Sequence, residues 1–163
     1  MAGAFDPARI LRTLAKRRVR YVLVGATAAR LQGFPRLTAD ADIAPAADPA
    51  NLKRLSAALR DLRARVYTEA VPEGLQFTCD AHTLSRADLW NFVTDAGRLD
   101  IVFKPSGTDG YRDLAQSAVT FEVFGIKVRA ASLEDILRSK LASNRPQDQQ
   151  DAIVLAEMLK KTR

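Results

Sequence analysis

The sequence has one cysteine, Cys79, and one histidine, His82. A single cysteine excludes an internal disulfide, and one cysteine with one histidine gives too few ligands for a Cys/His zinc site. No apolar run is long enough to span a membrane, so we expect no membrane partner. The first ten residues, MAGAFDPARI, lack a basic start followed by an apolar block. We therefore expect no secretory signal and a cytoplasmic location.

Charge, in contrast, is abundant and unbalanced. The 163 residues include 25 Lys and Arg against 19 Asp and Glu, a net charge of +6, and 47% of them are hydrophobic. This composition predicts one globular domain over 1–163, with a core over about 1–130 and a C-terminal helical part over about 131–163. A basic balance favours a polyanionic partner such as RNA, DNA or a nucleotide, although a solvated surface with surplus arginine explains it as well.

Periodic apolar positions predict a mixed α/β fold with hairpins in its sheet. Short apolar runs predict strands over 20–25, 38–44, 89–94, 98–103, 119–124 and 126–130, and the stretch 66–77 fits a strand with a turn at 72–74. Helical spacing and capping residues predict helices that begin near Asp6, Gly25, Asp48 and Ser132, and two more over 111–117 and 147–160.

Two aspartates stand one residue apart on the second predicted strand. Because side chains i and i+2 of a strand point to the same face, Asp40 and Asp42 project together. Asp100 is a third carboxylate, at the centre of the apolar strand RLDIVF. Adjacent carboxylates in apolar surroundings need a cation, and magnesium fits because it prefers oxygen ligands and leaves room for phosphates. The alternative is an edge strand whose aspartates are solvated or paired with arginine.

A glycine turn lies one short helix before these aspartates. Gly25 ends a buried strand, and Ala26 and Thr27 open the helix that follows. Glycine lets the backbone approach a phosphate closely, free N–H groups at the helix start can bind it, and Thr27 adds a hydroxyl. The phosphate site and the metal site would then lie at the same end of neighbouring strands. A turn that uses glycine only for its geometry is the alternative.

Together these features resemble the nucleotidyltransferases of the DNA polymerase beta-type superfamily. Their signature is a strand, a Gly-Gly or Gly-Ser turn, a helix, an acid-x-acid strand and a third acid on a later strand, which here reads Gly25-Ala26, Asp40-Ala41-Asp42 and Asp100. The run GFPRLTADAD, from Gly33 to Asp42, resembles the minimal AbiEii-type nucleotidyltransferases of bacterial toxin–antitoxin systems. The resemblance extends over about 20–159.

The resemblance implies a nucleotidyltransferase fold, with a mixed β-sheet flanked by helices and further helices at the C-terminal end. It implies transfer of a nucleoside monophosphate from a nucleoside triphosphate with Mg²⁺, or with Mn²⁺ in its place. Asp40, Asp42 and Asp100 would be catalytic and bind the metal, and Asp100 could act as the base on an acceptor hydroxyl.

The same resemblance assigns the nucleotide contacts. Gly25, the Ala26 amide and Thr27 would hold the triphosphate, and Arg36 would neutralise its charge. Ala26 departs from the pattern, since the family usually has Gly or Ser there. A serine would add a hydroxyl contact to the phosphates, so the alanine weakens the case for full activity.

The segment SKLASNRPQDQQDAIVL, from Ser139 to Leu155, also resembles the toxin-like group. By this resemblance Lys140 is a catalytic residue that touches a nucleotide phosphate, and Asp148 binds there and orients the phosphate or the acceptor. Structural alternatives exist for both, because a lysine at the edge of an apolar stripe extends to solvent and an aspartate in a first helical turn answers the helix dipole. For Asp151 we favour the structural role.

The acceptor implied by the resemblance is an RNA 3′ end, such as that of tRNA, or a protein hydroxyl, and a cognate toxin or antitoxin protein could be a partner. Three alternatives stay open. The chain could be an antitoxin-type enzyme that modifies a partner toxin. It could be a non-catalytic relative that binds nucleotide or a partner, as Ala26 suggests. It could modify a small molecule, as aminoglycoside nucleotidyltransferases do, although the positive net charge argues against a cationic substrate.

Overall fold

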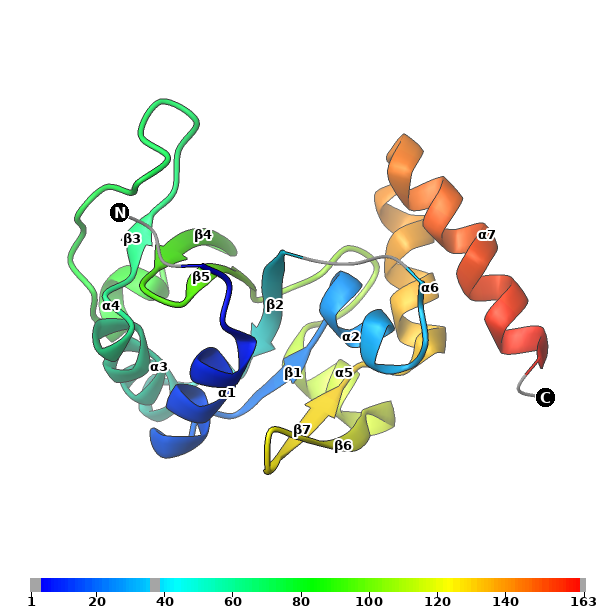
Figure 1. The fold of residues 1–163 in the computed structure, drawn as a ribbon, viewed down its shortest axis with the longest axis horizontal. Helices are drawn as coiled ribbons and strands as arrows, with labels where there is room; N and C mark the ends of the chain where they lie inside the picture. Colours follow the sequence, from blue (N-terminus) through cyan, green and yellow to red (C-terminus); the bar gives the residue numbers. More distant parts are fainter. Residues whose placement is uncertain (1–3, 36–38, 162–163) are drawn as a thin grey trace.

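The computed structural model describes residues 4–35 and 39–161. A seven-stranded sheet of order β3-β4-β5-β2-β1-β7-β6 forms its centre (Figure 1). The strands are β1 (Tyr21–Leu23), β2 (Asp40–Pro45), β3 (Arg65–Val66), β4 (Leu89–Thr94), β5 (Gly97–Val102), β6 (Val119–Val123) and β7 (Ile126–Ala130). The sheet is mixed, since β2 runs antiparallel to β1 and parallel to β5. The predicted mixed α/β fold class is confirmed.

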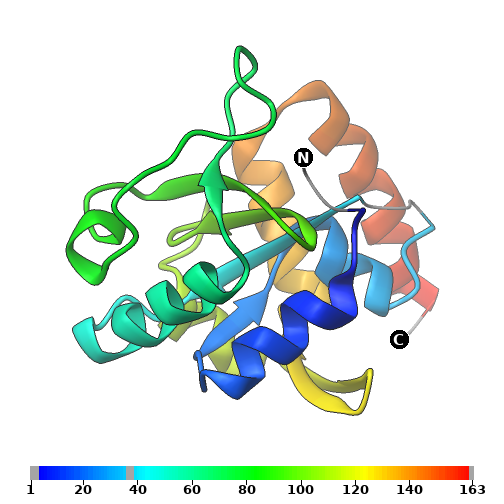
Figure 2. The ribbon, with the colours of Figure 1, turned by 60° about the vertical axis from the view of Figure 1, so that its left-hand side comes forward.

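Helices flank this sheet in two groups. They are α1 (Pro7–Lys16), α2 (Gly25–Leu31), α3 (Pro49–Asp61), α4 (Ala81–Leu84), α5 (Tyr111–Ser117), α6 (Leu133–Ser143) and α7 (Pro146–Lys161). Helices α1, α3 and α4 pack together on one side, whereas α6 and α7 lie side by side beyond α2 (Figures 1 and 2). No helix within the two described ranges is long and apolar enough to cross a membrane.

Polar side chains fix where α1, α3 and α6 begin. The carboxylates of Asp6 and Asp48 accept hydrogen bonds from the N–H groups of Arg9 and Asn51, and each is followed by a proline in the first turn. Ser132 accepts from the N–H of Asp135 in the same way. These contacts satisfy backbone donors that have no partner within the helix. The predicted starts of α1, α3 and α6 are confirmed.

Strand β5 separates the core from the face that carries the aspartates. Leu99 and Ile101 are fully buried and join the core, whereas Arg98, Asp100 and Val102 are half-buried on the opposite face. The alternation follows from the two-residue period of a strand. Burial of the apolar face therefore forces Asp100 to the other side of the sheet.

Some elements differ from the sequence prediction. The one-turn helix α4 was not expected, although Asp80 caps it by accepting from the N–H of Thr83. Of the stretch 66–77, only Val66 belongs to a strand, the two-residue β3, and an isolated bridge joins Val66 to Leu75. The predicted turn at 72–74 is present, with the N–H of Gly74 donating to the carbonyl of Val71. Such short elements depend on neighbouring contacts and leave little periodic signal. The start of the predicted strand 38–44 falls partly outside the described residues.

Candidate active site

The register between β2 and β5 aligns the predicted metal ligands. Asp42 is the direct neighbour of Asp100 across these parallel strands, and Asp40 is the neighbour of Arg98. All four side chains belong to the face opposite the core. Strand β2 is an inner strand, between β5 and β1. The alternative of an edge strand is therefore wrong, although Arg98 does lie near Asp100, with Nη2 3.7 Å from Oδ1.

Gly25 lies directly against Asp42. The N–H of Val24 donates to the carbonyl of Asp42, which brings the end of β1 beside the aspartates. Gly25 has a φ of +59°, and a Cβ there would meet Oδ2 of Asp42 at 3.0 Å. Positive φ and close approach both favour glycine. The glycine turn and the aspartates thus share one end of the sheet, as the sequence predicts.

Ala26 and Thr27, the two residues after Gly25, have different surroundings. Ala26 lines the cavity beside Asp40 and Asp42. Thr27 binds β2, because its hydroxyl donates to the carbonyl of Asp40 at 3.0 Å and accepts from the N–H of Asp42 at 3.2 Å. This hydroxyl fixes α2 on β2, and its predicted contact with nucleotide stays a prediction. Helix α2 has only 7 residues, so its dipole adds little to anion binding.

Helix α6 brings Lys140 to the same cavity. The Lys140 side chain is 17% exposed, and its Nζ lies 3.1 Å from Oδ1 of Asp148. Asp148 is buried and also accepts from Nε of Arg145, at 2.8 Å, and from the hydroxyl of Ser143. Both oxygens of Asp148 are therefore engaged within the chain. Arg36, the remaining predicted nucleotide contact, lies outside the described residues.

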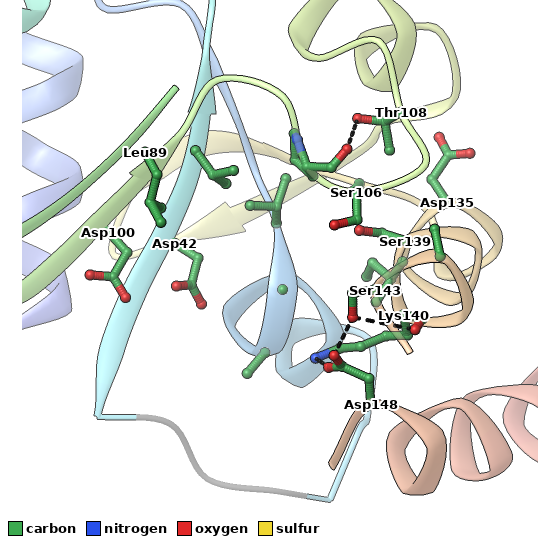
Figure 3. A pocket seen from close by; sticks show the side chains of 18 of the residues that line it. Asp42, Leu89, Asp100, Ser106, Thr108, Asp135, Ser139, Lys140, Ser143 and Asp148 are labelled. Carbon is green, nitrogen blue, oxygen red and sulfur yellow. Dashed lines mark hydrogen bonds and ion pairs between the residues drawn. The ribbon is translucent and has the colours of Figure 1, made fainter. Parts of the chain in front are cut away.

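These groups surround one cavity of about 1010 Å³. Figure 3 shows Asp42 and Asp100 on one side of it, and Lys140, Ser143 and Asp148 on the other. Carboxylates that can hold a cation thus face a lysine that can hold an anion. A metal-bound triphosphate carries both charges, and a cavity of this size accommodates one.

Burial and mutual repulsion make the aspartates unusual acids. Burial, followed by the charges of Asp100 and Asp40, raises the pKa of Asp42 to about 7, and Lys140 opposes the rise. Burial and the charge of Asp40 raise the pKa of Asp100 to about 6, with Arg98 opposing. A carboxylate pushed toward its neutral form by its neighbours gains from a nearby cation. The site thus favours a bound cation.

The donor set fits a magnesium ion in its chemistry. Asp100 Oδ1 is buried and finds no hydrogen-bond partner among the residues that the structure describes. Within those residues, however, no three His, Cys, Asp or Glu side chains are already grouped as a metal-binding set. The strand register therefore places the aspartates side by side, but it does not by itself form a complete set of metal ligands. Oxygen ligands of this kind suit Mg²⁺, which keeps several waters and shares substrate phosphates.

Two further residues of the cavity were not expected from the sequence. Asn91 is the neighbour of Asp100 across β4 and β5, so that Asn91, Asp100 and Asp42 form one row over three strands. Leu89 follows on the same face and is 55% exposed. The sequence feature that indicates them is their alternation along the strand with the aromatic residues Trp90 and Phe92, of which Phe92 is fully buried.

The fold has counterparts among solved structures. The lincosamide antibiotic adenylyltransferase LnuA, bound to lincomycin, has a TM-score of 0.61 at 14% identity, over 96% of this chain and 99% of that one. The antibiotic-resistance factor ANT(2'')-Ia has a TM-score of 0.56 at 19% identity, over 93% and 80%. A candidate nucleotidyltransferase from Thermotoga maritima has a TM-score of 0.54 at 18% identity, over 98% and 97%. At such identities the likeness shows the nucleotidyltransferase fold alone.

The sequence itself also matches a known family. No curated protein sequence matches the chain. A family model does, over residues 4–162, and describes a nucleotidyltransferase of unknown function (DUF6036). The match includes the glycine turn, the three aspartates and the C-terminal helices. This chain therefore belongs to the DUF6036 family of nucleotidyltransferases.

Proposed function

We propose that this protein transfers a nucleoside monophosphate from a nucleoside triphosphate to a hydroxyl acceptor. One observation carries the proposal: the aspartates of β2 and β5 face Lys140 across a single cavity, with the Gly25 turn between them. The family membership supports the same reaction class. Half-buried carboxylates held side by side without a cationic ligand would cost stability, so a purely structural role explains Asp42 and Asp100 poorly.

The proposed step exchanges one bond to phosphorus for another. The acceptor oxygen attacks the α-phosphorus, and the bond from that phosphorus to the oxygen bridging the β-phosphate breaks. Pyrophosphate leaves with the electron pair of that bond, and Asp100 accepts the proton of the attacking hydroxyl. Asp100 suits this role because it lies beside Asp42 on the cavity wall. Positioning and charge stabilisation supply most of the rate in such transfers.

Three parts of the chain would bind the donor. The backbone at Gly25 and Ala26 would approach the triphosphate, with Thr27 fixing the turn, and Lys140 would neutralise the phosphates. Arg36, which lies outside the described residues, remains a predicted contact. Asp40, Asp42 and Asp100 would hold Mg²⁺, or Mn²⁺ in its place, which when bound neutralises the phosphates and activates the attacking oxygen.

The preferred acceptor is an RNA 3′ end, such as that of tRNA, or a protein hydroxyl. The net charge of +6 supports a polyanionic acceptor. The resemblance to AbiEii-type proteins supports a toxin–antitoxin setting in the cytoplasm, in which a cognate protein would be either the target or the regulator.

A small molecule is the second candidate acceptor. Two structures of the same fold are named for antibiotic modification or resistance. The cavity wall also carries five aspartates, which suits a cationic compound. They are Asp40, Asp42, Asp100, Asp135 and Asp148.

Labelled nucleoside triphosphates test the proposal. Each of the four would be supplied with Mg²⁺ and with total tRNA, total cell protein, an aminoglycoside or a lincosamide, once labelled at the α-phosphate and once at the γ-phosphate. Transfer of the α-label alone, lost in the Asp40→Ala/Asp42→Ala double variant, supports the proposal, and the labelled acceptor decides between the candidates. Transfer of the γ-label would identify a kinase and contradict it. Nucleotide binding without transfer to any acceptor would favour the non-catalytic alternative.

A further inference from the structure

Two buried carboxylates of α7 hold the ammonium group of Lys140. Its Nζ lies 3.1 Å from Oδ1 of Asp148 and 3.3 Å from Oδ2 of Asp151. Asp148 and Asp151 are only 1% and 4% exposed, one helical turn apart on the face of α7 that packs on α6. We call these two residues the α7 carboxylate pair. A lysine in contact with two buried carboxylates is unlike the exposed ion pair between Lys160 and Glu157 on the same helix.

Each carboxylate of the pair is itself fixed by the chain. Asp148 accepts from Nε of Arg145 at 2.8 Å and from the hydroxyl of Ser143. Asp151 accepts from Nε2 of Gln147 at 3.1 Å through its other oxygen, Oδ1. These contacts leave the carboxylates little freedom to follow the lysine. The pair therefore sets the position of Lys140, and not the reverse.

The opposite side of Lys140 faces the aspartate site. Lys140 and Asp42 both line the cavity, and the charge of Lys140 acts on the Asp42 carboxylate across it. Figure 3 shows Lys140 extending from α6 beside Asp148, with Asp42 on the far wall. A lysine ammonium has three N–H donors. Lys140 donates one hydrogen bond, to Asp148, and forms an ion pair with Asp151, which together leave at least one donor for a partner in the cavity.

We propose that Asp148 and Asp151 are positioning residues, which hold Lys140 so that its remaining donor faces the phosphates of the nucleoside triphosphate. This inference rests on the proposed function. A lysine side chain loses substantial rotamer entropy when it binds a phosphate, and a lysine that is already held loses less. The C-terminal helix α7 thereby contributes to nucleotide binding through a residue of α6.

A positioning role and a purely electrostatic role of Asp151 predict opposite effects of Asp151→Asn on the affinity for a nucleoside triphosphate. Removing one negative charge beside Lys140 makes the site more positive, which alone would tighten the binding of a triphosphate. Loss of positioning weakens it, because Lys140 is then held on one side only. We expect about tenfold weaker binding, a coupling of the size found between residues in contact.

The first test needs no nucleotide. The protein would be treated briefly with an acetylating reagent, and acetylation of Lys140 would be compared by mass spectrometry with that of Lys104, an exposed lysine on a loop. We expect Lys140 to react about fivefold faster in Asp151→Asn than in the wild type. Glu157→Gln, the matched control on the exposed side of α7, should leave the rate unchanged. An unchanged rate in Asp151→Asn overturns the proposal.

The second test is a double-mutant cycle on nucleotide affinity. The Kd of the preferred nucleoside triphosphate with Mg²⁺ would be measured by calorimetry for wild type, Asp151→Asn, Lys140→Ala and the double variant. We expect the tenfold loss only where Lys140 is present, and less than a twofold change in the Lys140→Ala background. Equal losses in both backgrounds, or tighter binding by Asp151→Asn, would overturn the positioning role.

Two provisions keep the tests decisive. If Asp151→Asn does not fold, Gln147→Ala replaces it, because this change removes the hydrogen bond from Nε2 of Gln147 to Oδ1 of Asp151 without removing the charge of Asp151, and it should give the same effects at smaller size. If no nucleoside triphosphate binds the wild type, the proposed function fails. The acetylation rates alone then decide whether the α7 carboxylate pair holds Lys140.

Discussion

Replacing Asp42 by asparagine should stabilise the metal-free protein while removing its function. Asp42 is half-buried beside Asp100 and Asp40, and burial with these charges raises its pKa from 3.8 to about 7. Between these two values the native state binds more protons than the unfolded chain. The free energy of unfolding therefore decreases as the pH rises from about 4 to about 7. Asparagine keeps the shape and cannot ionise, so it escapes this loss.

The pKa shift of Asp42 determines how much more stable Asp42→Asn should be than the wild type. At about 1.4 kcal/mol per pKa unit, it corresponds to a ceiling of about 4 kcal/mol above pH 7. Because Asp42 faces a cavity that water can enter, we expect about half of this, near 2 kcal/mol. Asp42→Asn should thus be more stable than the wild type by about 2 kcal/mol at pH 8, and equally stable below pH 4.

Urea denaturation in EDTA, from pH 4 to pH 9, measures this difference. Asp61→Asn is the matched control, since the hydrogen bond from Arg17 lowers the pKa of Asp61 and neutralising it should destabilise the protein near neutral pH. Added Mg²⁺ should stabilise the wild type and not Asp42→Asn. A wild-type stability that stays constant from pH 4 to pH 8, or an Asp42→Asn variant less stable at pH 8, would refute the reasoning.

Three other substitutions probe the surrounding structure. Asp148→Ala leaves Lys140 with Asp151 as its one buried carboxylate and removes the acceptor of Arg145 and Ser143, so it should lower the free energy of unfolding by about 1.5–3 kcal/mol in urea denaturation. In the wild type this contribution is lost only at strongly acidic pH, because, against the effect of burial, the hydrogen bonds from Arg145, Ser143 and Lys140 hold the pKa of Asp148 below its usual range; a loss no larger than that of the exposed control Glu157→Ala would contradict this. Gly25→Ala should destabilise the protein by at least about 1 kcal/mol and weaken nucleotide binding, because its Cβ would press on Asp42. The control Gly125→Ala, at a φ of +76° with open space around it, should cost a similar backbone strain and leave nucleotide binding intact. Equal effects of the two substitutions on the calorimetric Kd would argue against a role for the Gly25 turn. Ala26→Ser should tighten nucleoside triphosphate binding about threefold by adding one hydroxyl contact on the cavity wall, and weaker binding would exclude a phosphate at this position.

The sequence predicts the parts of the site better than their arrangement. The two-residue period correctly places Asp40 and Asp42 on one face, and the apolar neighbours Leu99 and Ile101 correctly turn Asp100 away from the core. That Asp42 and Asp100 are direct neighbours depends on the parallel pairing of β2 with β5, two strands more than fifty residues apart in the chain. Local pattern does not determine such a register.

Contacts between elements explain what the sequence leaves out. The sequence does not predict that the Thr27 hydroxyl joins α2 to the backbone of β2, and its contact with a phosphate stays a prediction. Nor does it predict that Asp151, for which the sequence favours a structural role, contacts the cavity lysine together with Asp148. In both cases the partner lies on another element, so the spacing along the chain carries no signal for it. Asn91 could have been found, because its alternation with Trp90 and Phe92 already assigns it to the polar face.

The most direct test of the central claim is the binding of each nucleoside triphosphate by calorimetry, with Mg²⁺ and with EDTA, in the wild type and in Asp42→Asn/Asp100→Asn. We predict that one or more triphosphates bind the wild type only with Mg²⁺ and that the well-folded double variant loses this binding. Equal binding with EDTA, or undiminished binding by the double variant, would contradict a metal–nucleotide site on β2 and β5.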